Sequence, residues 1–410
     1  MARLIKENVI TAIDIGTTKI CVLVARKMGD QIEIIGIGKS PSHGLSKGVV
    51  IDIAKTINSI THAVKEAEMM AGMPIESAYI GISGAHISSV NSSGVVPIKQ
   101  GKIKQSDVDG VLDAAKAIAV AEGCQILHVL PQYFVIDGTD QVQDPIGMHG
   151  VRLEVQAHII MGAVSSVQNL VSCCQSAGIS VNDVILEQLA SADAVLSEDE
   201  RELSVGIIDI GGGTSDVAFY KNAAVRHTMV LPVAGNHVTN DIAIGLRITK
   251  NEAERIKKRY GFAIANLVEN EELIEVEMMQ GQDLQVIRLS DLVLIIESRM
   301  RELFSLINDE IHTHQLQKFM TNGIVLTGGG ALLTGARELA EEIFDCPVRI
   351  GTPRVLFDFV ETLQSPLYAT GYGLLVYVMR NDKKIKVDLS DEPLTRRVLE
   401  RMKLWVSDFF

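Results

Sequence analysis

One hairpin motif occurs twice in this chain of 410 residues, and this duplication restricts the fold more than any other feature. In each copy, two runs rich in Val and Ile flank a turn that opens with Asp-x-Gly, and the copies span residues 9–24 and 204–220. β-Branched residues on both sides of a small, polar turn are typical of a β-hairpin. An internal repeat at about half the chain length predicts two lobes of similar fold.

Helical periodicity follows each hairpin, at residues 53–70 in the first half and at 236–246 and 250–260 in the second. Strands that alternate with helices predict α/β lobes. The stretch 84–162 lies outside the duplication and combines strand-like pieces with one expected helix at 105–121. We therefore expect a subdomain inserted into the first lobe.

The first turn carries groups that suit a phosphate. Gly16 lets the backbone approach a ligand closely, and successive N–H groups in such a turn form an anion-binding concavity. Thr17 and Thr18 add hydroxyl donors, and Lys19 adds positive charge. Asp14 ends a buried strand, where a carboxylate is costly unless a cation such as hydrated Mg²⁺ shares the site. Taken alone, the turn is equally consistent with an ordinary hairpin and a capping Asp.

The second turn repeats this design with more glycine, in the residues Asp209, Gly211, Gly212, Gly213, Thr214 and Asp216. Two opposed turns and two carboxylates, Asp14 and Asp209, would hold a polyphosphate and its metal from both sides. A Walker loop and a Rossmann turn each open a helix. Because a strand follows the glycines here, both of those nucleotide-binding motifs are excluded.

A third glycine run follows an apolar strand and precedes a helix expected at 334–344; it comprises Gly328, Gly329 and Gly330, with Leu332 close behind. Backbone without side chains beside a helix N-terminus suits a flat base or a ribose phosphate. The alternative is a plain strand–helix turn. A run of consecutive glycines costs more unfolded-state entropy than such a turn requires, so we favour the ligand site.

The charge balance argues against one class of function. Lys and Arg total 38 against 51 Asp and Glu, a net charge of −13, whereas a nucleic-acid binder needs a basic face. The five cysteines show no metal-ligand spacing, so we expect buried thiols in a reducing compartment. No apolar run approaches the ~20 residues of a spanning helix, and the N-terminus lacks the pattern of a signal peptide. We therefore expect a cytoplasmic protein.

The order of the three glycine motifs resembles the actin/Hsp70/sugar-kinase ATPase superfamily, and within it the FtsA family of bacterial cell-division proteins along essentially the whole chain. The family-specific features are the insert, the segments 198–203 and 231–236, and an amphipathic C-terminal segment. The resemblance implies a two-lobed, actin-like α/β ATPase fold with a duplicated core. The implied parts are a lobe-one core (subdomain 1A) at 1–83 and 163–195, the inserted subdomain (1C) at 84–162, lobe two (2A and 2B) at 196–379 with 2B at about 245–315, a flexible linker at 380–392 and a membrane-targeting amphipathic helix at 393–410.

The resemblance also implies a bound ATP or ADP with Mg²⁺. The phosphates would be held by residues 16–19 from lobe one and by 211–214 from lobe two, and the two Asp residues that open the turns would face the metal through water. The remaining nucleotide contacts would come from Gly235, Asn236, Glu254, Lys257, the glycines at 328–330 and Leu332. For Glu254 and Lys257, the residues alone favour a solvated ion pair one helical turn apart.

Hydrolysis needs a group that orients water in line with the terminal phosphate. The resemblance gives that position to Glu187, although an exposed glutamate favoured by a helix N-terminus is an equally good interpretation. The resemblance implies slow hydrolysis at most.

The resemblance further implies that the outer subdomain of lobe two binds the C-terminal peptide of FtsZ. A helix expected there at 289–311 carries Arg299, Arg301 and Asn308; Arg suits a carboxylate partner, but a solvated basic face is an equal alternative.

The last segment, 393–410, predicts an amphipathic helix that lies on an anionic membrane surface. At about 100° per residue, most of its bulky apolar residues fall on one face: Leu394, Val398, Leu399, Met402, Trp405, Val406, Phe409 and Phe410. The opposite face is basic and the aromatic residues lie near the end, which favours anionic lipid. The alternative is a terminal helix packed on the core of the protein itself.

Together these features imply an ATP-binding, actin-like cell-division protein that polymerises, contacts other division proteins, and tethers FtsZ filaments to the cytoplasmic face of the inner membrane at the septum. A sugar-type kinase on the same fold is the main alternative, but no segment identifies a catalytic base beside an acceptor pocket. A chaperone of the Hsp70 type would need a further β-rich domain, and too few residues follow the last lobe helix to form one.

Overall fold

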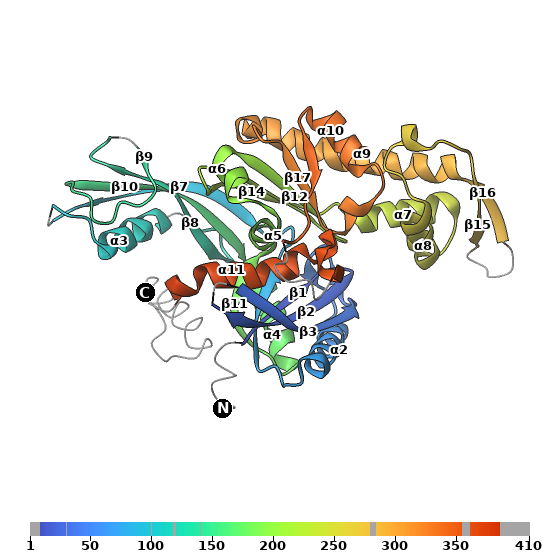
Figure 1. Cartoon of the computed structure of the whole chain (residues 1–410), viewed down its shortest axis with the longest axis horizontal. Helices are drawn as coiled ribbons and strands as arrows, with labels where there is room; N and C mark the ends of the chain where they lie inside the picture. The colour runs from blue at the N-terminus through green and yellow to red at the C-terminus, as the bar shows by residue number, and fades with distance from the viewer. Residues whose placement is uncertain are drawn as a thin grey trace.

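The computed structural model describes residues 9–29, 31–99, 101–117, 120–139, 141–278, 284–354 and 361–385. It contains two lobes, each built on a five-stranded sheet, and a smaller subdomain at one end of the molecule (Figure 1). Both sheets have the same plan, an antiparallel three-stranded meander extended by two parallel strands beside its first strand. The duplication predicted from the two hairpin motifs is therefore confirmed.

The elements of the first lobe are β1 Val9–Ile15, β2 Lys19–Met28, β3 Gln31–Pro41, β4 Leu45–Ser46, β5 Val49–Val50, α2 Ile53–Ala71, β6 Ser77–Ile82, α4 Val164–Ser176, β11 Ser180–Leu186, α5 Glu187–Val195 and α11 Ala369–Ile385. Its sheet has the order β11-β6-β1-β2-β3. Helices α2 and α4 pack on one face and α5 and α11 on the other. Coverage on both faces explains why β1 and β2 are apolar on both sides.

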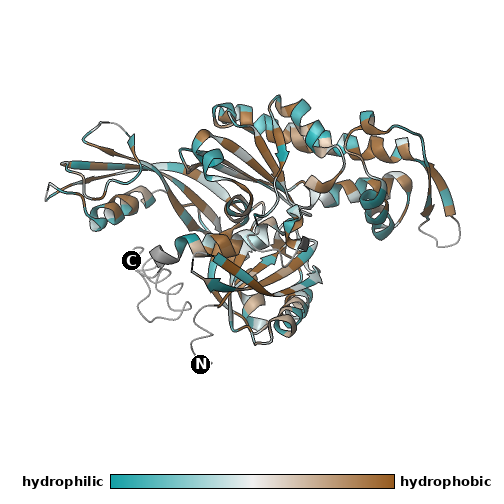
Figure 2. Ribbon diagram, in the orientation of Figure 1, coloured by the Kyte–Doolittle hydropathy of each residue, from teal (hydrophilic) through white to brown (hydrophobic). Residues whose placement is uncertain are grey.

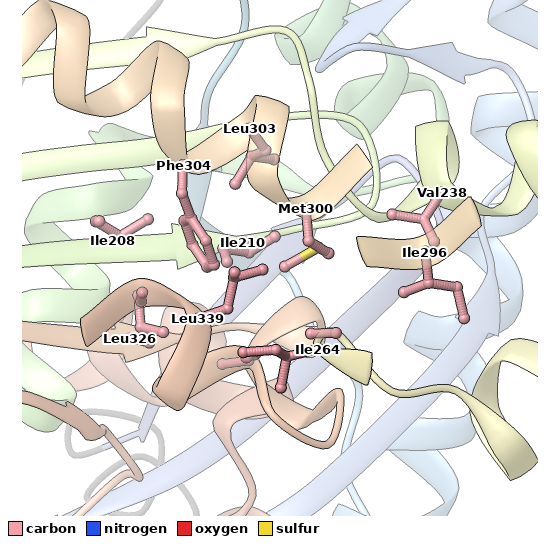
Figure 3. Packing of buried hydrophobic residues seen from close by; sticks show 14 of the residues in the cluster. Ile208, Ile210, Val238, Ile264, Ile296, Met300, Leu303, Phe304, Leu326 and Leu339 are labelled. Carbon is pink, nitrogen blue, oxygen red and sulfur yellow. The ribbon is translucent and has the colours of Figure 1, made fainter. Parts of the chain in front are cut away.

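The elements of the second lobe are α6 Glu198–Leu203, β12 Val205–Ile210, β13 Ser215–Lys221, β14 Ala224–Leu231, α7 Gly235–Leu246, α8 Lys250–Tyr260, η1 Ala265–Leu267, β15 Leu273–Glu277, β16 Leu284–Arg288, α9 Leu289–Thr313, η2 Leu316–Phe319, β17 Ile324–Thr327, η3 Gly329–Leu332, α10 Ala336–Phe344, β18 Val348–Ile350, η4 Glu361–Gln364 and η5 Pro366–Tyr368. Its sheet has the order β14-β13-β12-β17-β18. Helix α9 buries Met300 and Phe304 against the sheet residues Ile208 and Leu326 and against Leu339 of α10 (Figure 3).

The inserted subdomain is a four-stranded sheet of order β7-β10-β8-β9, covered by one helix. Its elements are β7 Ser88–Pro97, α3 Gln105–Lys116, β8 Cys124–Ile136, β9 Gln141–Val142 and β10 Arg152–Ala163. The helix was expected to reach Ala121, and that prediction was too long. The carbonyl of Ala121 instead accepts a turn hydrogen bond from the amide of Cys124, and Gly123, at φ +77°, leads the chain into β8. An alanine-rich run has high helix propensity but carries no stop signal of its own.

Two helices join the lobes. One hydrophobic cluster combines residues of α5 and α11 with residues of both sheets, such as Leu23 of β2 and Ile207 of β12. Figure 1 shows α5 and α11 in the middle of the molecule, and Figure 2 shows that apolar residues dominate the central strands while polar residues gather on the outer helices. In the described part of the chain, no helix has the length and apolar character needed to cross a bilayer. The helix expected at 393–410, with all its candidate membrane residues, lies outside the described residues.

Candidate functional site

The two hairpin turns have the same local closure. The amide of Gly16 donates to the carbonyl of Lys19 over 3.0 Å, and the amide of Gly211 donates to the carbonyl of Thr214 over 2.9 Å. In the second hairpin, Asp209 lies directly opposite Asp216. Each turn therefore ends a pair of buried strands and presents backbone amides at the same edge of its sheet.

The turns lie against each other across the two lobes. A Cβ atom built on Gly212 would come within 2.5 Å of the hydroxyl oxygen of Thr18, and one on Gly213 within 2.4 Å of the hydroxyl oxygen of Thr17. A real Cβ atom cannot approach that closely, so glycine is required at both positions. The structure thus brings together the two motifs that the sequence predicted to act as a pair.

The third glycine run, residues 328–330, lies beside the start of the second hairpin turn. Gly328 has φ +81°, and a Cβ atom there would lie 2.2 Å from a carboxylate oxygen of Asp209. The expected helix at 334–344 begins instead at Ala336, because Gly329–Leu332 form a 3₁₀ turn and Gly335 adopts a left-handed conformation. The carbonyl of Thr334 meanwhile accepts from the amide of Ala263. The glycines therefore do not lie at an α-helix N-terminus, and Leu332 is half exposed.

Four carboxyl groups gather beneath the turns: those of Asp14, Glu187, Asp209 and Asp216. The three Asp residues are buried. Burial raises the pKa of Asp14 to about 6, with Lys19 opposing the rise and Asp209 adding to it. Burial also raises the pKa of Asp209, although hydrogen bonds from the hydroxyls of Ser191 (2.5 Å) and Thr370 (3.1 Å) oppose the rise. Buried carboxylates that repel one another favour a cation in their midst.

Asp216 belongs to the same cluster, and sequence reasoning gave it no role. It accepts hydrogen bonds from the hydroxyls of Ser83 and of Thr214, the latter over 3.0 Å. Burial raises its pKa to about 7, against these hydrogen bonds. The second motif already contained this residue as its final Asp, so a signal was present. Ser83, Ser191 and Thr370 come from distant segments whose patterns gave no such signal.

Glu187 opens helix α5 and is half-buried rather than exposed, so the interpretation as an exposed helix-start residue is wrong. A Cβ atom on Gly81 would lie 3.1 Å from its Cγ. Burial, followed by the negative charges of Asp14, Asp216 and Asp209, holds the pKa of Glu187 well above its usual range. The side chain therefore belongs to the carboxyl cluster.

Lys19 supplies the nearest positive charge to these carboxyl groups. Its Nζ lies 4.0 Å from the carboxylate of Asp14, donates to the carbonyl of Leu367, and lies 4.5 Å from the ring centroid of Tyr368. One lysine leaves the cluster with excess negative charge. Within the described ranges, no three His, Cys, Asp or Glu side chains are arranged as a direct metal site. The carboxylate and hydroxyl oxygens of this cluster are of the kind that hold a hydrated cation through water.

The start of α7 supports the second turn. The amides of Gly235 and Asn236 donate to the carbonyls of Gly211 (3.1 Å) and Gly212 (2.8 Å). Lys257 of α8 donates to the carbonyl of Gly235 over 3.2 Å and lies 2.6 Å from Glu254. Its side chain is only 15% exposed, and burial lowers its pKa, against the opposing charge of Glu254. The pair is therefore built into the α7–α8 contact and is not the solvated pair that the residues alone favoured.

The candidate partner residues lie elsewhere, on α9. Arg299 pairs with Asp241 over 2.5 Å and with Glu302, and Arg301 pairs with Glu297 (2.9 Å) and Glu342 (2.7 Å). These pairs show that neither Arg is simply a solvated cation. The side-chain amide of Asn308 donates to the carbonyl of Ile343 over 3.3 Å. All three residues therefore tie α9 to neighbouring helices or to the end of α10.

Solved structures share this fold at low sequence identity. The "PilM-PilN type IV pilus biogenesis complex" matches with a TM-score of 0.64 at 15% identity, covering 90% of this chain and 98% of that one. MreB5 of Spiroplasma citri bound to ADP matches with a TM-score of 0.59 at 16% identity, covering 92% and 98%. At these identities the matches show the fold alone, an actin-like ATPase fold.

Sequence comparisons are more specific. The family model "Cell division protein FtsA" matches residues 206–373, and the model "SHS2 domain inserted in FTSA" matches residues 84–161. The cell division protein FtsA of Pseudomonas aeruginosa is 44% identical over 100% of both chains, that of Neisseria meningitidis 39% over 99% of both, and that of Escherichia coli K12 38% over 92% of both. These matches do not favour a sugar kinase. The chain is an actin-like cell-division protein and belongs to the FtsA family.

Proposed function

We propose that this protein binds ATP or ADP with Mg²⁺ between its two hairpin turns and uses the nucleotide to control its assembly into polymers. The observation that carries the proposal is the convergence of three glycine motifs, from both lobes, on one cluster of buried carboxyl groups. Amides in glycine turns bind phosphate oxygens, and buried carboxylates need a cation. A magnesium polyphosphate supplies both partners at once.

Each motif has a distinct role in this proposal. The first turn (Gly16, Thr17, Thr18 and Lys19) and the second turn (Gly211–Thr214) hold the phosphates. Asp14 and Asp209 accept hydrogen bonds from water on the metal, whose bound charge stabilises the phosphate oxygens. The base side is formed by Gly235, Asn236, Glu254, Lys257, Gly328, Gly329, Gly330 and Leu332. Because the turns are in contact, a nucleotide must separate Thr17 and Thr18 from the glycines opposite them.

Glu187 is our candidate for orienting the attacking water. Burial and the neighbouring carboxylates raise the pKa of Glu187, and a bound cation would lower that pKa by offsetting the neighbouring negative charges. Coupling between the ionisation of this carboxyl group and metal binding favours slow turnover. We therefore propose that hydrolysis is slow and that the nucleotide acts mainly as an assembly ligand.

We propose further that the protein polymerises and tethers FtsZ to the cytoplasmic face of the inner membrane at the septum, together with other division proteins. The FtsA family membership supports this role. The segment 393–410 supports it by its pattern of apolar and basic residues, typical of a helix that lies on anionic lipid. One such helix binds reversibly, and a polymer that presents many of them gains avidity.

Co-sedimentation with anionic vesicles tests the proposal. With ATP and Mg²⁺ present, we expect the full chain to carry FtsZ into the vesicle pellet, and a chain truncated after Ser390 to leave FtsZ in the supernatant. Trp405→Glu should also abolish recruitment, since it places a charge on the apolar face of the helix, whereas Ser407→Ala, on the polar face, should not. Trp405 is the only tryptophan, so its fluorescence should shift to the blue on vesicles. Equal pelleting of the truncated and full-length chains would refute the anchor.

A further inference from the structure

A second candidate site lies between the inserted subdomain and the second lobe. A cavity of about 550 Å³ is lined there by residues from three separate segments: the insert sheet, the β13–β14 hairpin and the chain just after α9. None of the residues of the two phosphate turns lines it. Its volume falls within the range of small-molecule sites, roughly 300–1,000 Å³. This cavity is distinct from the nucleotide site proposed above.

The charge lining the cavity has one sign. Lys221, Arg226 and Lys318 all line it, whereas no Asp or Glu among the described residues does so. Within the same described part of the chain, none of these three cations lies within ion-pair distance of a carboxylate. Such convergence is unexpected in a protein of net charge −13. Three like charges around one cavity repel one another unless an anion lies between them.

The contacts of Arg226 position its guanidinium group to bind such an anion. It is only 9% exposed, its Nε donates to the carbonyl of Lys221 over 3.1 Å, and its guanidinium carbon lies 5.7 Å from the ring centroid of Tyr133. Burial lowers the pKa of Arg226, the direction expected for a guanidinium without a compensating anion. The described residues offer its two terminal nitrogens no recorded hydrogen-bond acceptor. A planar fork of free donors suits the oxygens of a phosphate.

The remaining lining suits an organic group. The imidazole rings of His227 and His314 lie 4.8 Å apart at an interplanar angle of 32°, and both line the cavity with Tyr133. Burial, with a further effect from His314, lowers the pKa of His227 to about 4. His227 is therefore neutral at pH 7, and its ring offers a flat, weakly polar surface. The side-chain amide of Gln156 lies on the insert side of the same cavity.

We propose that this cavity binds a small organic phosphate. The phosphoryl group binds to Lys221, Arg226 and Lys318, and the organic group packs on the rings of Tyr133 and His227. Because the cations come from lobe two and Tyr133 from the insert, the ligand bridges the two parts. Its binding therefore favours the docked position of the insert.

Calorimetric titration of the full chain tests this site with 4-nitrophenyl phosphate, an aromatic phosphate that is not a nucleotide. We expect it to bind more tightly than inorganic phosphate, and 4-nitrophenol, which lacks the phosphoryl group, to show no binding. The double variant Lys221→Gln/Lys318→Gln should bind the aryl phosphate at least tenfold more weakly, about 1.4 kcal/mol. Lys318 is exposed and Lys221 half-buried, so an unchanged melting temperature should confirm that this variant folds.

Two controls locate the binding. Lys116→Gln removes an exposed lysine of the insert that pairs with Asp113 over 2.7 Å, and it should leave the titration unchanged. Gly212→Ala perturbs the phosphate turns and should also leave it unchanged. No binding by the parent protein, equal affinity for inorganic phosphate, equal binding by the double variant, or loss of binding in Gly212→Ala would each overturn the proposal. The last outcome would assign the anion to the phosphate turns and would leave the proposed nucleotide site intact.

Discussion

At the scale of single residues, the buried carboxyl groups make the protein sensitive to pH. Burial raises the pKa of Asp216 from its ordinary value of 3.8 to about 7, so the folded protein holds this proton more tightly than the unfolded chain does. Stability therefore falls as the pH rises from about 4 to about 7, because the unfolded chain releases the proton first. Asp14, with a pKa of about 6, acts in the same direction.

Asp216→Asn should remove part of this pH dependence. Without nucleotide or Mg²⁺, we expect the free energy of unfolding of the variant to rise relative to the parent between pH 5 and pH 8, by at least about 1 kcal/mol, since one pKa unit corresponds to about 1.4 kcal/mol. Urea denaturation at both pH values measures the difference. Asp113→Asn is the matched control, because the Asp113 side chain is 71% exposed. Parallel stability profiles for Asp216→Asn and the parent would contradict the prediction.

Gly212→Ala should weaken binding of ATP with Mg²⁺ at least tenfold, about 1.4 kcal/mol. The added methyl group would lie 2.5 Å from the hydroxyl oxygen of Thr18, so the turns must shift and their amides lose the arrangement that binds phosphate. Gly110→Ala is the control, since a Cβ atom there meets nothing within 4 Å. Calorimetry on both variants provides the comparison. Unchanged affinity in Gly212→Ala would remove the second turn from the site.

The sequence predicted which residues come together where those residues belong to the motifs themselves. Asp14, Asp209 and the glycines of both turns meet in space because each ends a strand at the same edge of duplicated sheets. Ser191 and Thr370 could not be predicted, because each hydroxyl gains its role only when α5 and α11 pack over Asp209. Such contacts depend on packing between distant segments, which no local pattern contains.

At the scale of elements, helix α11 approaches α5 so closely that one position requires glycine. A Cβ atom on Gly373 would lie 1.9 Å from the carbonyl oxygen of Ala190, whereas one on Gly371 would meet its nearest neighbour, in Leu23, at 3.5 Å. The first distance is impossible and the second is ordinary contact. Gly373 therefore has no room for a side chain, whereas Gly371 has room for a methyl group.

Gly373→Ala should lower the free energy of unfolding by about 1–3 kcal/mol, the usual cost of overpacking. Gly371→Ala should be neutral or slightly stabilising, because alanine favours a helix over glycine. Urea denaturation of both variants tests the pair. Since α5 also carries Ser191, which donates to Asp209, Gly373→Ala should weaken ATP binding as well. Equal stability of the two variants would contradict the close approach of α5 and α11.

Elements with clear start and stop signals were predicted well. Helix α2 runs from Ile53 to Ala71 against an expected 53–70, because the side chain of Asp52 caps its start and Gly72 ends it in a left-handed conformation. Helix α8 matches its expected bounds, 250–260. Helices α3 and α10 were predicted too long. An alanine-rich run extended the expected α3 beyond Lys116, and the expected α10 began two residues early because Gly335 adopts a left-handed conformation just before the helix.

At the scale of the whole molecule, the contact with FtsZ is a proposal that the ion pairs of α9 allow us to test. Arg301 bridges α9 to α10 through Glu342 over 2.7 Å, so a peptide carboxylate would have to replace Glu342. Arg301→Glu should weaken binding of the FtsZ C-terminal peptide at least tenfold, about 1.4 kcal/mol, by charge repulsion. Glu342→Gln keeps the cation and should retain binding. Fluorescence anisotropy with a labelled peptide measures both, and unchanged affinity in Arg301→Glu would remove Arg301 from the contact.

The inserted subdomain belongs to lobe one by its chain connections but is hydrogen-bonded to lobe two. The side-chain amide of Gln132 donates to the carbonyl of Val225 over 2.9 Å, and the hydroxyl of Ser89 donates to the carbonyl of Thr228 over 3.0 Å. The lobes are thus connected twice, through the α5–α11 pair and through the insert. Mechanically this is a closed linkage and not a simple hinge. One lobe cannot rotate freely about the central helices unless the insert also turns or releases β14, so a rotation of one lobe against the other is transmitted to the far end of the molecule.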